Sequence, residues 1–328
     1  MKSIKTILLP FVLLTFFFAS CEKEDSPTII IDNNISPTLS SQLNKFFEDN
    51  NNEATQLHSV SSSSNIQTIY TNTHNYSISF GPSTFNYSNG TPVSGDFTIE
   101  IIEAISKKEM MMLNKPTFTN DGQLLVSGGI IYLNAMQGNQ QLSINDANPV
   151  IVSIPTNEYV EMELFDGSFD ENNDFGWDTS EDNVTIVIQD DSTNVPGGNG
   201  FFSYNFSMDS IGWINCDYFY NSTDPLTGVN VILPDDFNGS NSIVFIYYTD
   251  INSVANMNDY DQDSNFDLGL GYSTPVGMDI SFVVIAEIDS TFYYNIVSNV
   301  TLSENHIENI DNLIEVTEEE LQTIIDNI

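Results

Sequence analysis

Short stretches in which apolar and polar residues alternate dominate the chain from about residue 65 onward. In the segment Gly95 to Glu103, for example, Phe97, Ile99 and Ile101 alternate with polar residues. Successive side chains of a β-strand point to opposite faces, so this pattern predicts a half-buried strand. The same reasoning predicts strands at 130–135, 150–154, 162–165, 184–188, 202–206, 213–218, 229–233, 243–248, 280–287 and 291–296.

Turn-forming dipeptides separate these stretches at intervals of roughly ten residues. They are Asn89-Gly90, Asp121-Gly122, Gly138-Asn139 and Asp166-Gly167. Short strands with this spacing are typical of antiparallel sandwiches and not of parallel α/β folds. We therefore expect a mainly β protein with two β-sandwich-like domains, a short N-terminal helix and a C-terminal helix.

The glycine-rich segment 195–200 is the strongest candidate for a domain boundary. It divides an N-terminal β domain at 66–194 from a C-terminal β domain at 195–328. We expect residues 21–65 to be a tether that carries the short helix and ends in a serine-rich linker at 59–65. Residues 1–20 have the composition of a signal peptide.

Apolar periodicity and capping residues predict the two helices. Ser36 and Pro37 suit a helix start. One face of the helix would carry the apolar residues Leu39, Leu43, Phe46 and Phe47. Near the C-terminus, Thr317-Glu318-Glu319-Glu320 is a capping box. The helix that it starts has an apolar face, which we expect to dock on a sheet; binding of a partner protein is the alternative. The residues of that face are Leu321, Ile324, Ile325 and Ile328.

The first twenty residues combine a basic start with a short apolar core. Lys2 and Lys5 are their only charges, and the apolar run from Ile7 to Phe18 is shorter than the roughly 20 residues that span a bilayer as a helix. A basic start, a short apolar core and an exit of small residues indicate a secretory signal.

The exit Phe18-Ala19-Ser20-Cys21 resembles the lipobox of bacterial lipoproteins, although Phe18 stands where leucine is usual. The resemblance implies cleavage before Cys21, lipidation of its thiol and attachment to a membrane through that lipid. Two or more acyl chains give stable anchoring. The following Lys23-Glu24-Asp25 resembles the signal that directs lipoproteins of Bacteroidota to the cell surface, which implies an outer-membrane, surface-exposed location.

The chain is strongly acidic, with 46 Asp and Glu against 7 Lys and a net charge of −39. Loss of Lys2 and Lys5 with the signal would take this value to −41. Proteins bind nucleic acid chiefly by neutralising its phosphates with Lys and Arg, so nucleic acid is excluded as a partner. The acidic surface keeps the protein soluble and attracts cations.

Cys216 is the only cysteine besides Cys21, so lipidation of Cys21 leaves no intramolecular disulfide. A nucleophilic cysteine needs a base or a cation beside it, and His58, His74 and His306 all lie far from Cys216 in sequence. We expect a buried core cysteine.

One acidic run has the alternating oxygen ligands of a calcium loop. The candidate ligands are Asp259, Asp261, Asp263, Asn265 and Asp267. Ser264 stands where such loops have glycine, and Leu270 where they have a bidentate glutamate. In a chain this acidic, a solvated loop is the alternative to a Ca²⁺ site.

The sequence shows no catalytic motif: it has no nucleophile elbow, phosphate loop, dinucleotide fingerprint or zinc-ligand spacing. A catalytic pair of carboxylates of the glycosidase type is not excluded, since 46 acidic residues supply many pairs. Exposed aromatics could form a sugar-binding platform, or could alternate into the core. The candidates are Tyr218, Phe219, Tyr220, Tyr247, Tyr248, Tyr293 and Tyr294.

Three further segments resemble uncharacterised Bacteroidota cell-surface lipoproteins. They are Gly212-Trp213-Ile214-Asn215-Cys216-Asp217, the stretch from Val93 and Gly95 to Glu103, and Ser127-Gly128-Gly129-Ile130-Ile131-Tyr132. No activity comes with the resemblance. We expect a lipid-anchored surface protein with a binding, adhesion or envelope-structural role and with glycans or envelope proteins as partners. The alternatives are a glycan-binding component of a nutrient-uptake system and a carboxylate-based hydrolase.

Overall fold

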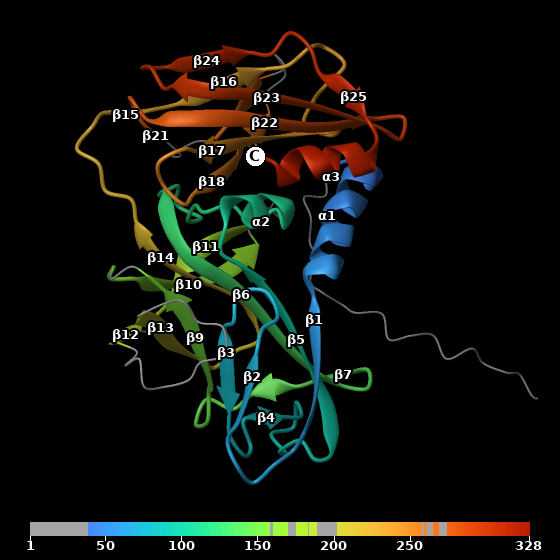
Figure 1. The fold of residues 1–328 in the computed structure, drawn as a ribbon, viewed down its shortest axis with the longest axis vertical. Helices are drawn as coiled ribbons and strands as arrows, with labels where there is room; N and C mark the ends of the chain where they lie inside the picture. Colours follow the sequence, from blue (N-terminus) through green and yellow to red (C-terminus); the bar gives the residue numbers. More distant parts are fainter. Residues whose placement is uncertain are drawn as a thin grey trace, which may run out of the picture. The chain divides into compact units, whose positions relative to one another are not determined.

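A computed structural model describes residues 39–157, 160–169, 175–182, 184–188, 202–257, 259–260, 265–268 and 274–328 of the chain (Figure 1). The signal peptide, Cys21, Ser36, Pro37 and the segment 195–200 lie outside these residues. The structure confirms a mainly β protein with antiparallel sheets, a short N-terminal helix and a C-terminal helix. No helix in these ranges is long and apolar enough to cross a membrane.

The first half of the chain, up to Phe219, forms two sheets that face each other across one core. The strands of sheet A, in spatial order, are β1 (Gln56–Ser61), β5 (Asp96–Ala104), β6 (Leu125–Gln137), β14 (Gly212–Phe219), β10 (Glu163–Phe169) and β11 (Phe175–Thr179), and β7 (Gln140–Gln141) pairs with β6. The strands of sheet B are β12 (Thr185–Ile188), β13 (Phe202–Met208), β9 (Val150–Thr156), β3 (Ser77–Phe80) and β2 (Gln67–Tyr70). The short strands β4 (Phe85–Asn86) and β8 (Ser143–Ile144) pair at one end.

Alternation places the core of this sandwich as predicted. Phe97, Ile99 and Ile101 of β5 are buried, and they face Ile78 and Val152 of sheet B in one cluster. Burying such side chains is worth about 1.5–3 kcal/mol each, before the entropy of ordering the chain is subtracted.

The second half, from Tyr220 on, repeats the two-sheet arrangement around a second core. The strands of sheet C are β19 (Asp259–Tyr260), β20 (Asn265–Asp267), β16 (Val229–Ile232) and β24 (His306–Asn309), with β16 and β24 parallel. The strands of sheet D are β18 (Val254–Met257), β17 (Ser242–Tyr248), β22 (Asp279–Ile288), β23 (Thr291–Thr301) and β25 (Ile314–Val316). A short pair joins β15 (Leu226–Thr227) to β21 (Thr274–Pro275).

Helices cover the face of sheet D that points away from this core (Figure 1). Helix α1 (Ser41–Ala54) is capped by Ser40, whose hydroxyl accepts from the N–H of Leu43. Its Phe46 and Phe47 rings pack against Phe292 and Phe245, with centroids 5.6 and 6.2 Å apart. Helix α3 (Glu318–Asp326) starts at the predicted capping box, contacts β23 and buries Leu321 and Ile325. The expectation that it docks on a sheet is confirmed.

Two boundaries differ from the sequence-based expectation. Residues 56–61 form β1, an edge strand of sheet A, although they were assigned to the tether. The strands that follow the segment 195–200 also belong to the first half, since β13 pairs with β9 and β14 pairs with β6 and β10. Within the described residues, the change from one core to the other therefore falls after Phe219.

The two halves are interlocked. Phe118 and Leu124 belong to the first half in sequence but pack in the core of the second. The backbone N–H of Thr117 donates to the carbonyl of Val254 at 2.8 Å, and the Thr117 and Ser253 hydroxyls lie 2.6 Å apart. Because side chains from the first half are part of the second core, the two sandwiches form one compact unit.

Candidate functional site

Strand pairing in sheet A brings together the three segments that resemble surface lipoproteins. Strand β14 carries Asn215, Cys216 and Asp217 and lies beside β6, with Asp217 opposite Ser127. Strand β5, which ends the segment from Val93 and Gly95 to Glu103, lies on the other side of β6. The register of β14 and β6 shifts between Asn215 and Asp217, which indicates a β-bulge. Bulges re-aim side chains and often mark special sites.

Asp217 lies fully buried at this bulge. One of its carboxyl oxygens, Oδ2, accepts from the Asn215 amide at 2.5 Å, and Oδ1 is buried without a hydrogen-bond partner. The Ser127 hydroxyl in turn donates to Oδ1 of the Asn215 side chain at 3.0 Å. Burial raises the pKa of Asp217 to about 8, against the opposing effect of hydrogen bonding from Ser127, Asn215 and the backbone N–H of Gly128. This carboxyl is therefore mostly protonated at neutral pH.

Cys216 is a free and fully buried thiol in the core of the first sandwich. Burial and the neighbouring Asp217 raise the pKa of this thiol well above its usual value. A thiol that resists ionisation is a poor nucleophile. The prediction of a core cysteine is confirmed.

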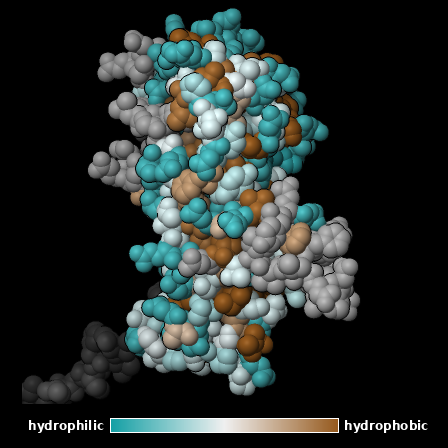
Figure 2. Space-filling model, turned by 90° about the vertical axis from the view of Figure 1, so that its left-hand side faces the viewer, coloured by the Kyte–Doolittle hydropathy of each residue, from teal (hydrophilic) through white to brown (hydrophobic). Residues whose placement is uncertain are grey.

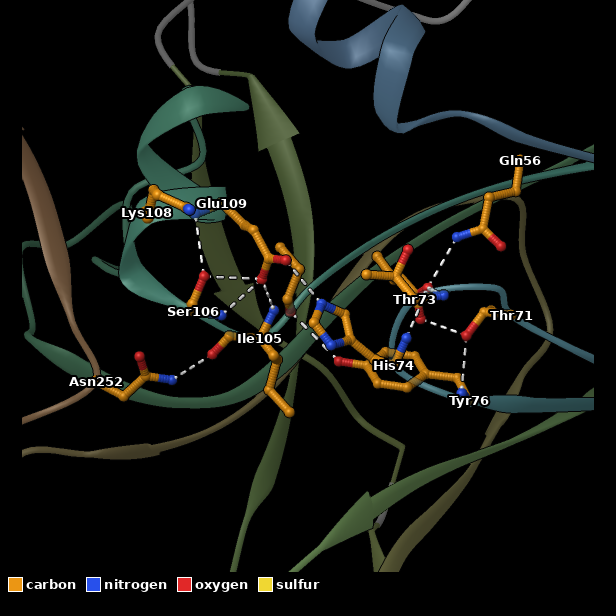
Figure 3. Close-up of polar contacts among 12 residues, drawn as sticks. Gln56, Thr71, Thr73, His74, Tyr76, Ile105, Ser106, Lys108, Glu109 and Asn252 are labelled. Carbon is orange, nitrogen blue, oxygen red and sulfur yellow. Dashed lines mark hydrogen bonds and ion pairs between the residues drawn. The ribbon is translucent and has the colours of Figure 1, made fainter. Parts of the chain in front are cut away.

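A second polar group surrounds Glu103, near the end of β5, and its partners Gln56, Thr71, Thr73 and His74 are labelled in Figure 3. Its carboxylate accepts from Gln56 at 2.8 Å, from the backbone N–H groups of Thr73 and His74 at 3.0 and 3.1 Å, and from the Thr71 hydroxyl. The carboxylate is almost fully buried. These bonds attach the turn between β2 and β3 to sheet A, so the role of Glu103 is to hold that turn.

His74 extends from the same turn to helix α2 (Lys107–Met112). Its Nε2 lies 2.8 Å from Glu109 Oε1 (Figure 3). Glu109 also accepts from the N–H groups of Ile105 and Ser106 and completes the capping box of α2. Burial lowers the pKa of His74, but the hydrogen bond and charge of Glu109 outweigh it, so the net shift is upward. The pKa of Glu109 falls to about 2, because these bonds outweigh its own burial.

Tyr76 donates its backbone N–H to the Thr71 hydroxyl at 2.8 Å. The Tyr76 hydroxyl donates to the carbonyl of Ala104 at 3.3 Å, and a Cβ on Gly129 would collide with that hydroxyl. Gly129 has φ +143°, which side chains with a Cβ rarely adopt. The glycine of the third segment is therefore needed both for its backbone conformation and for space.

The lysines of α2 and the loop after it connect the halves. Lys107 Nζ donates to the carbonyls of Tyr248 and Thr249, and Lys108 Nζ lies 3.4 Å from Asp326 of α3. Asn252 adds two bonds from the second half, to the carbonyls of Ile105 and Ser127, at 2.8 and 2.7 Å. Of the four lysines in the part of the chain that the structure describes, Lys107 and Lys108 thus bond from the first half to the second.

Lys115, just after α2, is only 4% exposed. Its ammonium group lies 4.0 Å from the ring centroid of Phe175 and 4.9 Å from that of Trp213. Cation–π contacts of this kind favour a buried cation. Sequence reasoning missed both Lys115 and the His74–Glu109 pair. The only local signal for the pair was the capping-box spacing of Ser106 and Glu109.

The predicted calcium run forms a short hairpin in which Asp259 pairs with Asp267 across β19 and β20, and Asn265 begins β20. Asp261 and Asp263 lie outside the described residues. Among the residues that the structure describes, no group of three His, Cys, Asp or Glu side chains could hold a metal ion. Calcium binding stays a prediction.

The predicted aromatic platform is not an open row. Tyr248 is fully buried, Lys107 covers the Tyr247 ring at 4.4 Å, and Tyr293 packs edge-on against Phe237. These rings contribute to packing, as the alternation of strand residues allows. On the face drawn in Figure 2, hydrophobic residues are interspersed with hydrophilic ones.

A groove of about 530 Å³ runs beside α3 and carries carboxylates. It is lined by Val316, Thr317, Glu319, Glu320, Thr323 and Ile324. Glu320 completes the capping box by accepting from the N–H of Thr317 at 2.8 Å. The carboxylate of this residue is therefore engaged in helix capping.

The chain matches no protein-family model, and a search of the curated proteins gives no match either.

Proposed function

We propose that this protein is a lipid-anchored protein of the outer membrane, exposed on the cell surface, with a binding, adhesion or envelope-structural role. The proposal of a non-catalytic role is supported by the positions of the side chains that could take part in catalysis. Cys216, Asp217 and Glu103 are all buried, and Asp217 and Glu103 are held in hydrogen-bond networks that fix strands and turns.

The lipobox supports the anchored part of the proposal. Nineteen residues lie between Cys21 and Ser41, the first residue of α1. A chain of this length spans at most about 70 Å when fully extended. Because α1 packs on sheet D, the lipid is covalently connected to the folded body through a docked helix.

The experiment is intact mass and membrane partitioning of the protein from its native host, beside Cys21→Ala, with protease accessibility on whole cells. We expect a diacylglycerol mass increment on the wild-type protein and digestion by external protease. Both the increment and the membrane association should be lost in Cys21→Ala. Cys216→Ala is the matched control. This second cysteine is buried, so the Cys216→Ala protein should keep the lipid on Cys21. A soluble, unmodified wild-type protein would refute the proposal.

A further inference from the structure

The outer face of sheet B differs in chemistry from the rest of this acidic chain. Strand alternation points Ile78, Val152 and Phe206 into the first core and their neighbours outward. Register places most of the outward residues in two rows across the sheet; in the next row Ser203, opposite Pro155, is buried. One row is Thr68, Ser79, Ile151 and Ser207, and the other is Tyr70, Ser77, Ser153, Asn205 and Thr185.

None of these nine side chains carries a charge, although the net charge of the chain is −39. Six are serine or threonine, and the other three are Tyr70, Asn205 and Ile151. All nine are at least partly exposed. A basic protein partner would find no carboxylates here. An apolar partner would find only two sizeable apolar groups, Tyr70 at 41% and Ile151 at 44% exposed.

Hydroxyl and amide groups that both donate and accept hydrogen bonds match a ligand that is itself uncharged and rich in hydroxyls. Strands lie about 4.8 Å apart and same-face residues about 6.7 Å apart, so the groups form a regular array that suits a repeating polymer. Tyr70 lies on β2, at the edge of the sheet, where its ring can pack against the C–H face of a sugar.

The array is held by strands, which reduces the entropy lost when a ligand binds. The Thr68 and Ser79 hydroxyls already lie 2.8 Å apart across β2 and β3. Serine and threonine also have short side chains, so ordering each of them costs little.

We infer that the outer face of sheet B binds a chain of neutral sugars, with Tyr70 stacked on one ring and the serine and threonine hydroxyls bonded to sugar hydroxyls. The inference rests on the proposed function, since the face meets such a polymer only at the cell surface.

The test is affinity electrophoresis of the full chain in native gels that contain one uncharged polysaccharide each: a β-1,3-glucan, a β-1,4-glucan, a dextran or a mannan. Tyr70→Ala removes the stacking ring, and Ser79→Asp places a carboxylate in the array. Asn309→Asp introduces the same carboxylate on an exposed strand of sheet C and is the matched control. Equal thermal midpoints of the variants and the wild type establish that they fold.

We expect at least one neutral polysaccharide to retard the wild type and Asn309→Asp. Tyr70→Ala and Ser79→Asp should raise the dissociation constant at least tenfold. Absence of retardation in all four gels overturns the inference, and so does retardation that neither face variant changes. The assay does not depend on the lipid, so its failure is separate from failure of the mass and partitioning experiment on Cys21.

Discussion

The hydroxyl group of Tyr76 occupies the space that a Cβ atom on Gly129 would need. Tyr76 is fully buried and anchored to Ala104, so it cannot move aside without breaking that bond. We expect Gly129→Ala to lower the free energy of unfolding by about 2–4 kcal/mol, from overpacking and from strain at φ +143°. Chemical denaturation measures it. Gly228→Ala is the control, because no atom lies within 4 Å of a Cβ at Gly228. Equal losses in the two variants would contradict the prediction.

Asp217 should make the protein less stable as pH rises. The folded state keeps this proton up to about pH 8, whereas the unfolded chain releases it near pH 3.8. Between these values the folded state binds more protons, so the free energy of unfolding falls with increasing pH. The contribution is at most about 6 kcal/mol. In urea unfolding at pH 5 and pH 8.5, Asp217→Asn should lose less stability between the two pH values than the wild type.

Asp224→Asn is the matched control for this experiment, since Asp224 is exposed. It should show the same pH dependence as the wild type. If the Asp217→Asn and wild-type curves run parallel, Asp217 is ionised in the folded protein at neutral pH.

The His74–Glu109 pair should stabilise the fold within a pH window. The pKa of His74 is raised above 6.5, so its contribution is full below pH 6.5 and is lost as pH rises through the folded value. The pKa of Glu109 is lowered from 4.5 to about 2, so its contribution is full above pH 4.5 and is lost as pH falls toward 2. The pair therefore contributes most between about pH 4.5 and 6.5.

Titration of the His74 ring by NMR checks this coupling. Glu109→Gln should lower the pKa of His74, because burial then acts without the charge of Glu109. The titration of His58, which burial and Glu103 control, should not change. A His74 titration that is the same in wild type and Glu109→Gln would show that the two side chains are not in contact in solution.

Lys115→Met should destabilise the protein by about 1–2 kcal/mol, through loss of the cation–π contacts with Phe175 and Trp213. Methionine keeps most of the apolar stem, so the variant isolates the ammonium group. Denaturation followed by tryptophan fluorescence measures the effect, and the emission of Trp213 should shift. Lys45→Met, at an exposed helix position, should leave the stability almost unchanged. A Lys115→Met protein as stable as the wild type would contradict the prediction.

Calcium binding at the run that ends in Asp267 predicts a higher thermal midpoint in millimolar Ca²⁺ than in chelator. Hard cations prefer oxygen ligands, and extracellular calcium sites bind at about 10⁻⁴–10⁻³ M. The double variant Asp261→Asn, Asp263→Asn should abolish the difference, whereas Asp235→Asn, Asp236→Asn, two acids elsewhere in the second half, should preserve it. Identical midpoints in Ca²⁺ and in chelator would identify the run as a solvated loop.

The local patterns in the sequence predicted strands, because alternation is a property of neighbouring residues. The strand predicted at 95–103 is β5 within one residue, and the capping box at Thr317 starts α3. The edge strand β1 was missed because its outward residues Ser59 and Ser61 made it resemble a serine-rich linker. Burial of His58 and Val60 on its other face restores the alternation.

Long-range relationships were not visible in the sequence. His74 and Glu109 are 35 residues apart, and nothing near either one specifies the other. The pairing of β13 and β14 with first-half strands depends on contacts across many residues, whereas the glycine-rich segment 195–200 marked only a break in local structure. The burial of Lys115 likewise depends on rings from β11 and β14, which the local sequence around Lys115 does not contain.

The insertion of Phe118 and Leu124 into the second core has a consequence for how the chain matures. Thr117 bonds to Val254, 137 residues later, so this contact cannot form until most of the polypeptide has been synthesised. Contacts of such long sequence separation slow folding and leave apolar surface uncovered in the meantime. A nascent chain would therefore present Phe118 and Leu124 to its surroundings until the strands of the second core have been synthesised.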